Sequence, residues 1–262
     1  MPPLALSVIV ITKNEARHIE DCLRSVAFAD ECIVVDGGST DATRTLAEGL
    51  GARVVEAPDW RGFGAQKNRA LALARGRWVL SLDADERVSD ELAAQIRTVV
   101  HSGADAPPAF ALDRLSSFCG QWMRHGDWYP DRVLRLFLRD AGRFSDDLVH
   151  ERLLVDGRVG KLRGHLLHHT MRDLADALDK MNRYSSGRAL DRLHAGARGG
   201  LARALGHGVW AFVRCYGLRR GFLDGRLGLV LALYVAEGTY YRYLKMRWPA
   251  AAPASGLPVD PV

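Results

Sequence analysis

The feature that most constrains this chain is a regular alternation of short apolar runs and amphipathic stretches over its first hundred residues. The apolar runs predict strands, and they cover residues 6–12, 32–35, 52–56 and 78–82. Helices are predicted between them over 15–26, 41–50 and 65–74, and a further helix is predicted from Ser89, as N-cap, to about His101. Repeated strand–helix units of this kind predict an α/β fold with a mainly parallel, doubly wound sheet.

Composition narrows the class of protein. With 48% hydrophobic and 26% charged residues, the chain has the composition of a folded globular protein. Its four cysteines are scattered and form no C-x-x-C pair, which argues against a zinc site or a disulfide framework and predicts a reducing cytosol. The first apolar run has no basic stretch before it, so we expect no signal peptide.

Polar clusters follow three of the predicted strands, at residues 12–15, 36–41 and 83–86. Ligands of open α/β sheets bind beyond the carboxyl ends of the strands, so these clusters predict one site. Asp83 and Asp85 supply oxygen ligands for a divalent cation, Mg²⁺ or Mn²⁺, which would offset charge on a leaving diphosphate. The alternative is that both aspartates only solvate a strand end.

The first two clusters also admit purely structural interpretations. Thr12 and Glu15 have the spacing of a capping box for the next helix, although a helix N-terminus at this corner would also favour an anion. Asp36 could accept a hydrogen bond from a base N–H, with Gly38 allowing close approach of a ligand to the backbone. Its alternative is a tight turn in which Asp41 caps a helix.

Lys67 lies near the start of the predicted helix 65–74. A lysine there opposes the helix dipole, a small cost that binding a phosphate would justify. The alternative is a solvated surface lysine.

In their order and their positions at strand ends, the three clusters resemble those of the GT-A family-2 glycosyltransferases. The matching sequences are Ile11-Thr12-Lys13-Asn14-Glu15, Val35-Asp36-Gly37-Gly38-Ser39-Thr40-Asp41 and Leu82-Asp83-Ala84-Asp85-Glu86. The resemblance implies the GT-A nucleotide-diphospho-sugar transferase fold and a metal-dependent, inverting reaction. It also implies that Glu15 and Asp36 contact the ribose and base of a UDP-like donor, and that Asp83 and Asp85 serve the ribose and the metal. The predicted nucleotide-sugar site as a whole comprises Thr12, Asn14, Glu15, Asp36, Gly38, Lys67, Asp83 and Arg135.

The chain departs from the commonest family pattern in two places: Thr-Lys-Asn-Glu replaces Pro-x-Tyr-Asn-Glu, and a single aspartate replaces a pair at the second site. Further matches at 128–131, 135–137, 149–151, 221–225 and 240–245 resemble the branch with bacterial lipopolysaccharide-core glucosyltransferases. That branch implies transfer of one hexose, glucose first, from a UDP-sugar to a heptose of the inner core. The polymerase signature Gln-x-x-Arg-Trp is not met, because His125 follows Arg124, so a single transfer is expected.

The catalytic base is expected in a cluster formed by Asp146, Asp147, His150 and Glu151. A carboxylate within reach of the acceptor hydroxyl suffices for an inverting transfer. Glu151 is the first choice, because the Val-His-Glu element of the resemblance lies where the acceptor enters, and Asp147 is the second. His150 is a predicted third metal ligand beside Asp83 and Asp85.

Two sets of polar residues are harder to assign. His165, His168 and His169 have a spacing that would align them on a helix, and we interpret them as structural or donor-proximal and not as a zinc site. Arg132 and Arg135 are both candidates to clamp phosphates, but on a strand at 133–138 they point to opposite faces, so only one can face the site.

The chain is expected to divide into a catalytic domain at 1–170 and a helical extension at 171–248. The donor half of the domain is about 1–104, the acceptor half 105–170, and 249–262 is a flexible tail.

Residues 183–248 hold 12 Lys and Arg against three acidic residues, although the net charge of the whole chain is +5. Together with the aromatic residues and the apolar run 227–236, this predicts docking on an anionic membrane surface, peripheral on the cytoplasmic face of the inner membrane. The alternatives are helices that only pack on the domain or that form a homo-oligomer; no nucleic-acid motif accompanies the charge.

Three rival functions were weighed, and two of them remain open. One is the same fold acting on a polyprenyl phosphate or another cell-envelope glycan, and another is a non-catalytic sugar-nucleotide-binding scaffold at the membrane. The third, a nucleotidyltransferase, lacks its glycine-rich phosphate loop after the first strand.

Overall fold

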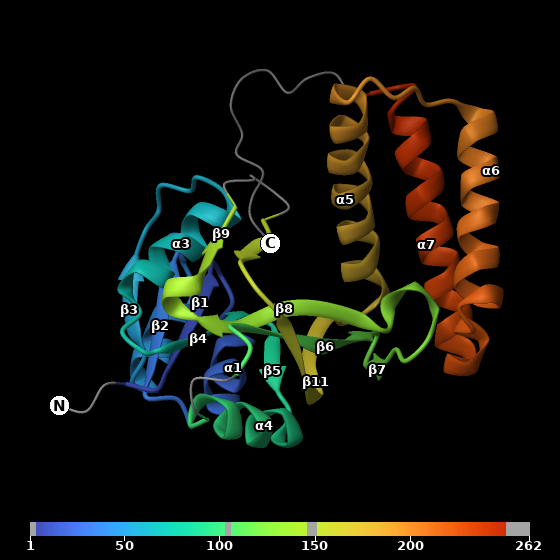
Figure 1. Ribbon diagram of the computed structural model, residues 1–262. Helices are drawn as coiled ribbons and strands as arrows, with labels where there is room; N and C mark the ends of the chain where they lie inside the picture. The colour runs from blue at the N-terminus through green and yellow to red at the C-terminus, as the bar shows by residue number, and fades with distance from the viewer. Residues whose placement is uncertain (1–3, 103–105, 146–150, 250–262) are drawn as a thin grey trace. The chain divides into compact units, whose positions relative to one another are not determined.

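A nine-stranded mixed sheet organises the first part of the chain, as the computed structural model shows (Figure 1). Its strands are β1 (Leu6–Thr12), β2 (Glu31–Asp36), β3 (Arg53–Glu56), β4 (Trp78–Asp83), β5 (Glu86–Val88), β6 (Ala109–Phe118), β7 (Gln121–Trp122), β8 (Asp131–Leu138) and β11 (Val159–Met171). They run in the order β3-β2-β1-β4-β8-β6-β11-β5, with β7 paired to β6. The pairs among β1 to β4 are parallel, whereas β8 pairs antiparallel with β4 and β6, and β11 with β5. A two-stranded sheet joins β9 (Gly142–Phe144) to β10 (Leu153–Val155).

Helices cover both faces of the parallel strands, because successive side chains of a strand point to opposite faces. Val8 and Val10 pack in a core with α1 (Ile19–Ser25), α2 (Thr43–Gly49) and α4 (Asp90–Val100). Ile9 and Ile11 pack in a second core with α3 (Phe63–Leu73). The predicted α/β class with helices on two sides is therefore confirmed, as is Ser89 as the N-cap of α4.

The structure describes residues 4–102, 106–145 and 151–249, and these form two compact units. The first unit contains the chain up to Arg114 together with Asp131–His168, and the second contains Leu115–Pro130 and the chain from His169 onward. The chain thus passes three times from one unit to the other, twice within a strand, in β6 and in β11. Short 3₁₀ helices lie at η1 (Gly126–Trp128) and η2 (Arg139–Ala141).

The second unit is built on three helices, α5 (Leu174–His194), α6 (Leu201–Phe212) and α7 (Gly225–Lys245), with α7 between the other two (Figure 1). A π-helical turn, η3 (Val213–Leu218), and a 3₁₀ turn, η4 (Gly221–Asp224), join α6 to α7. None of the helices in the described ranges combines the length and the apolar character needed to cross a membrane.

The apolar residues of these helices are divided between the core of the second unit and its surface. Within the apolar run 227–236, Leu231 is buried in the core of the second unit with Leu227, Val230 and Tyr234 packed around it, so much of this run supports the unit's own core. On α5, the large apolar side chains Leu174, Leu178, Tyr184 and Leu190 are exposed. The helix instead buries Ala177, Met181, Ser185 and Ala189, mostly small residues that allow close packing.

Candidate active site

Three of the predicted site residues meet at one edge of the parallel sheet. In the register of the strands, Thr12 of β1 lies opposite Asp36 of β2, and Ile11 lies opposite Asp83 of β4. The three strands end together because they are parallel and in step. The expectation that the polar clusters share one edge is therefore confirmed.

The loops after β1 and β2 are tied together by hydrogen bonds. The backbone N–H of Asn14, which has a φ of 57°, donates to the Ser39 hydroxyl at 2.8 Å, and the Asn14 side chain accepts from the Thr40 N–H at 2.8 Å. The N–H of Glu15 donates to the Thr43 hydroxyl at 2.8 Å. These bonds fix the loop conformation before any ligand is bound.

The predicted capping box was wrong. The helix begins at Ile19, with His18 as its N-cap, so Thr12 and Glu15 precede it by several residues. The backbone carbonyl of Glu15 accepts from the N–H groups of His18 and Ile19. The Thr12 hydroxyl is buried and has no hydrogen-bond partner among the described residues.

Asp36 adopts the turn that was its structural alternative. One carboxylate oxygen accepts from the N–H groups of Gly38 (3.0 Å) and Ser39 (2.8 Å), and the other from the Ser39 hydroxyl. Gly38 has a φ of 89°, a conformation that favours glycine, so its presence here is required by the turn. The Asp36 carboxylate thus shapes the loop directly.

Asp83 lies between two cations. Its Oδ1 is 3.0 Å from the ammonium of Lys67, and its Oδ2 is 2.5 Å from the guanidinium of Arg135. The side chain of Lys67 is only 3% exposed, so its interpretation as a solvated surface lysine was wrong. Both Asp83 oxygens are therefore engaged by protein cations.

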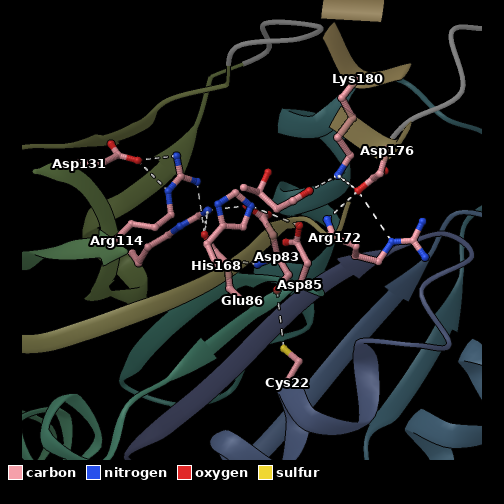
Figure 2. A network of polar contacts seen from close by, with 12 residues as sticks. Cys22, Asp83, Asp85, Glu86, Arg114, Asp131, His168, Arg172, Asp176 and Lys180 are labelled. Carbon is pink, nitrogen blue, oxygen red and sulfur yellow. Dashed lines mark hydrogen bonds and ion pairs between the residues drawn. The ribbon is translucent and has the colours of Figure 1, made fainter. Parts of the chain in front are cut away.

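Glu86, which the sequence analysis did not select, is fully buried beneath Asp83. It accepts from Arg135 at 2.8 Å and from the Asp83 N–H at 3.0 Å, and it lies 3.4 Å from Arg114. Figure 2 shows Arg114 between Glu86 and Asp131, which is 2.7 Å away. Glu86 directly follows the Asp83-Ala84-Asp85 motif in the sequence, and this position was the signal that could have identified it.

These contacts make a chain of alternating charge, here called the ion chain. It runs Asp131, Arg114, Glu86, Arg135, Asp83, Lys67, Glu151, and every link is 3.4 Å or shorter. Buried charges are tolerated when each is paired in this way. The ion chain therefore holds the carboxylates of Asp83 and Glu86 in fixed positions.

The ion chain also sets protonation. Burial alone raises the pKa of the Asp83 carboxyl, but the Arg135 guanidinium and the Lys67 ammonium outweigh it and hold that pKa far below its ordinary value. Burial lowers the pKa of Arg135, but Asp83 and Glu86 reverse this and raise it. Asp83 is thus ionised throughout the neutral range.

Glu151, the first-choice base, forms the end of the ion chain. Its Oε1 lies 2.7 Å from Lys67, and its side chain is 17% exposed. Gly64 permits this approach of α3 to the segment around β9, because a Cβ there would lie 1.9 Å from the Ser145 carbonyl oxygen. Asp147, the second-choice base, and His150, the predicted third metal ligand, lie outside the described residues.

Asp85 has a histidine neighbour. Its Oδ2 lies 3.2 Å from Nε2 of His168, which strand pairing places opposite Glu86 (Figure 2). The expected helical alignment of His165, His168 and His169 was wrong, since all three belong to β11. On a strand His168 faces away from the other two.

The residues around Asp85 fit a divalent cation with an incomplete protein shell. Two ligand atoms bound at about 2.1 Å and at right angles lie roughly 3 Å apart, as the Asp85 and His168 atoms do. Asp83 fits less well, because both of its oxygens bind cations. Within the described part of the chain, no three His, Cys, Asp or Glu side chains gather as a metal site.

The two candidate arginines point apart, as the strand period predicts. Arg135 is buried on the ion chain, whereas Arg132 lies beside Asp113 at 3.4 Å with its side chain 61% exposed. Only Arg135 therefore lies near the strand-end carboxylates.

Comparison with solved structures gives matches of low similarity. The Staphylococcus aureus TarS 1–349 structure in complex with UDP is 19% identical, with a TM-score of 0.47, and the match covers 67% of this chain and 63% of that one. A Mycobacterium tuberculosis glucosyl-3-phosphoglycerate synthase in complex with Mn²⁺, UDP and phosphoglyceric acid is 28% identical, with a TM-score of 0.36, over 45% of this chain and 44% of that one. The chain thus spans less than two thirds of either structure.

Comparison of sequences gives a match over a larger part of the chain than the solved structures do. The model of "Glycosyl transferase family 2" matches residues 7–125, which include the strand ends at Thr12, Asp36 and Asp83. The lipopolysaccharide core biosynthesis glycosyltransferase LpsC of Rhizobium meliloti (strain 1021) is 30% identical over 262 residues, or 94% of this chain and 96% of that protein. The chain therefore belongs to glycosyl transferase family 2, with the GT-A α/β fold, and transfers sugar from a nucleotide sugar.

Proposed function

We propose that this protein transfers one hexose, with glucose as the first candidate, from a UDP-sugar to a heptose of the lipopolysaccharide inner core, with inversion at the anomeric carbon. The observation that carries the donor half of this proposal is the ion chain. It presents Asp83 at a strand end, between two buried cations and beside Asp85. The acceptor half is supported by the similarity to LpsC over nearly the whole of both chains.

In this proposal Glu151 removes the proton of the acceptor hydroxyl. The hydroxyl oxygen then attacks the anomeric carbon, and the UDP diphosphate leaves with the electrons of the broken bond. Lys67 orients Glu151, because its ammonium lies 2.7 Å from the carboxylate and cannot turn to solvent from a buried position. Asp147 is the alternative base.

The donor would lie along the three strand ends. The loops that contain Asn14, Glu15 and Asp36 would hold the nucleoside, and Arg135 would keep Asp83 aimed at the ribose. Asp85 and His168 would hold Mg²⁺ or Mn²⁺, whose positive charge would offset the negative charge of the diphosphate. The reaction would take place on the cytoplasmic face of the inner membrane, where a glycolipid acceptor is accessible.

The test is acceptor-dependent release of UDP by the purified full chain. The assay contains UDP-glucose, Mg²⁺ or Mn²⁺ and a heptose-containing lipid A-core acceptor, and it compares Asp85→Ala and Glu151→Gln with the wild type. Asp140→Ala is the matched control, because this carboxylate is 85% exposed and pairs only with Arg139 among the described residues. We expect release by the wild type and the control and a loss in both site variants.

Each other outcome has a definite meaning. UDP release only with a polyprenyl phosphate would replace the acceptor but keep the reaction. UDP binding without release on any donor or acceptor would favour a sugar-nucleotide-binding scaffold. Full activity of Glu151→Gln would move the base to Asp147.

A further inference from the structure

The α6 helix of the second unit is built with its small residues inside and its large apolar residues outside. It buries Ala204, Gly208 and Ala211, and a Cβ on Gly208 would meet α7 atoms at 3.4 Å. The small side chains therefore allow α6 to pack closely on α7. The large side chains must then point elsewhere.

The exposed side of α6 is apolar. Leu205, Val209 and Trp210 are 52%, 64% and 53% exposed, and Leu201 is 53% exposed. At 3.6 residues per turn, Val209 and Trp210 lie on the side of the helix opposite its buried stripe. Three further exposed apolar side chains, Leu218, Phe222 and Leu223, lie in the turns that follow α6. We call these seven residues the α6 surface.

The stretch of sequence that contains the α6 surface is basic. Residues 192–223 contain six arginines and no aspartate or glutamate. Arg203 lies at one margin of the exposed apolar side of α6, and Arg219 and Arg220 lie in the turns. Among the described residues, no carboxylate pairs with any of these three, whereas Arg214 is paired with Asp127.

The α5 helix of the same unit makes a useful contrast. Its exposed Leu178 and Leu190 have exposures like those of α6, at 51% each. However, α5 contains Asp176, Asp179 and Asp191 among its basic residues. Exposed apolar residues among charges of both signs are ordinary protein surface, whereas an apolar face with a basic margin is the pattern of an interfacial helix.

We propose that the α6 surface docks the second unit on an anionic phospholipid bilayer, with Leu205, Val209 and Trp210 in the acyl boundary and Arg203, Arg219 and Arg220 at the headgroups. The alternative occupant, a second copy of this chain, is disfavoured by charge. A two-fold dimer through this surface would place the same basic residues opposite one another with no carboxylate between them. This extends the proposed function, in which the acceptor is a membrane glycolipid, but it does not depend on the sugar or the acceptor.

The test is co-sedimentation of the full chain with vesicles that contain neither donor nor acceptor. Vesicles of phosphatidylcholine alone are compared with vesicles that also contain phosphatidylglycerol, at low and high salt. We expect binding to the anionic vesicles that weakens with salt, because exposed charges are screened. In Arg203→Gln/Arg219→Gln, binding should fall about fivefold for each arginine removed.

The apolar contribution is tested by Leu205→Glu/Trp210→Glu, with Leu178→Glu/Leu190→Glu on α5 as the matched control. We expect about a 100-fold or greater loss of binding in the α6 variant, because two anchoring side chains are lost and two like charges are added. The control should remain within about twofold of the wild type, since exposed apolar residues among charges of both signs are ordinary surface. Circular dichroism and a thermal melt confirm that both variants fold.

Three results would overturn the proposal: absence of binding to anionic vesicles, equal binding by the α6 variant and the wild type, or equal loss of binding in the α5 control. A dimer in light scattering that the α6 variant abolishes, without vesicle binding, would assign the surface to a second copy. Because the vesicles carry no substrate, these results are independent of UDP release, and either proposal can fail alone.

Discussion

The ammonium nitrogen of Lys67 lies 2.7 Å from Oε1 of Glu151, a residue 84 positions away in the sequence. The same nitrogen lies 3.0 Å from Asp83, so one buried cation links the proposed base to the strand-end carboxylate of the donor site. Loss of that cation would leave two carboxylates near each other without their shared partner. Four of the five predictions below follow from the ion chain and its neighbours.

Replacing Lys67 with methionine keeps most of the apolar side chain and removes its charge. We expect a cost of about 3–5 kcal/mol in the free energy of unfolding, because breaking a buried ion pair leaves uncompensated charge. UDP release should also be lost. The control, Lys161→Met, removes a half-exposed ammonium beside Asp113 and should cost at most about 1 kcal/mol in urea denaturation. Equal costs in the two variants would show that Lys67 is not buried as described.

Glu86→Gln tests whether the buried middle of the ion chain positions Arg135. The variant keeps the shape of the side chain but removes the charge shared by Arg135 and Arg114. We expect about 3–5 kcal/mol of destabilisation and weaker UDP binding, measured by denaturation and by calorimetric titration. Asp131→Asn, at the half-exposed end of the ion chain, should cost at most about 1 kcal/mol. Normal UDP binding in folded Glu86→Gln would remove the positioning role.

Asp85 and His168 are expected to act together on the metal. Asp85→Asn and His168→Gln should each reduce Mn²⁺ affinity in the presence of UDP, by about 100-fold or more, since even residues that only support a ligand contribute 10- to 100-fold. Isothermal titration measures this without any turnover. His165→Gln, three residues earlier on β11, should leave Mn²⁺ affinity unchanged. A loss in the His165 variant alone would place the metal elsewhere.

Acid should weaken the first unit partly through Asp83. The folded-state pKa of this carboxyl lies well below its unfolded value of about 3.9, because Arg135 and Lys67 outweigh the effect of burial. The folded state therefore binds fewer protons, so the stabilisation is present above about pH 4 and is lost as pH falls toward the folded pKa. Melts of the wild type and Asp83→Asn across this range should converge at low pH. A constant difference between them would contradict the linkage.

Gly64→Ala tests the close contact between α3 and the segment before β10. Because a Cβ would lie 1.9 Å from the Ser145 carbonyl oxygen, backbone must move, at a cost of about 1–3 kcal/mol. Activity should fall as well, since Glu151 lies in this segment. Gly49→Ala is the matched control, because no atom of the described residues lies within 4 Å of the position that its Cβ would take, and helical alanine is favoured. Urea denaturation should separate the two, and a neutral Gly64→Ala would show that the contact is loose.

The sequence predicted those parts of the fold that are determined by residues near one another in the chain. Strand ends such as Thr12, Asp36 and Asp83 follow from where apolar runs stop, and parallel pairing then brings them together. Ser89 caps α4 through its own side chain, 3.4 Å from the backbone nitrogen of Leu92, so a contact within four consecutive residues decides that boundary. Arg132 and Arg135 separate by the period of a strand alone.

What sequence did not predict depends on distant neighbours. Nothing near Lys67 in the chain indicates that it is buried, because its partners Asp83 and Glu151 come from other elements. The spacing of His168 from His165 and His169 is compatible with a helix. Only the pairing of β11 with β5 places His168 beside Asp85. The apolar residues of α5 and α6 have helical spacing, yet the packing of small residues on α7 turns many of them outward.

The three passages of the chain between the two units affect how the molecule can be dissected. Because residues 115–130 belong with the C-terminal helices, a truncation after β11 would strip Phe118 and Met123 of the core they share with Leu231. Deleting 115–130 as well would interrupt β6 and remove β7 entirely. Neither compact unit is one uninterrupted stretch of the chain. Sugar transfer and lipid attachment therefore have to be separated by point substitutions in the intact polypeptide.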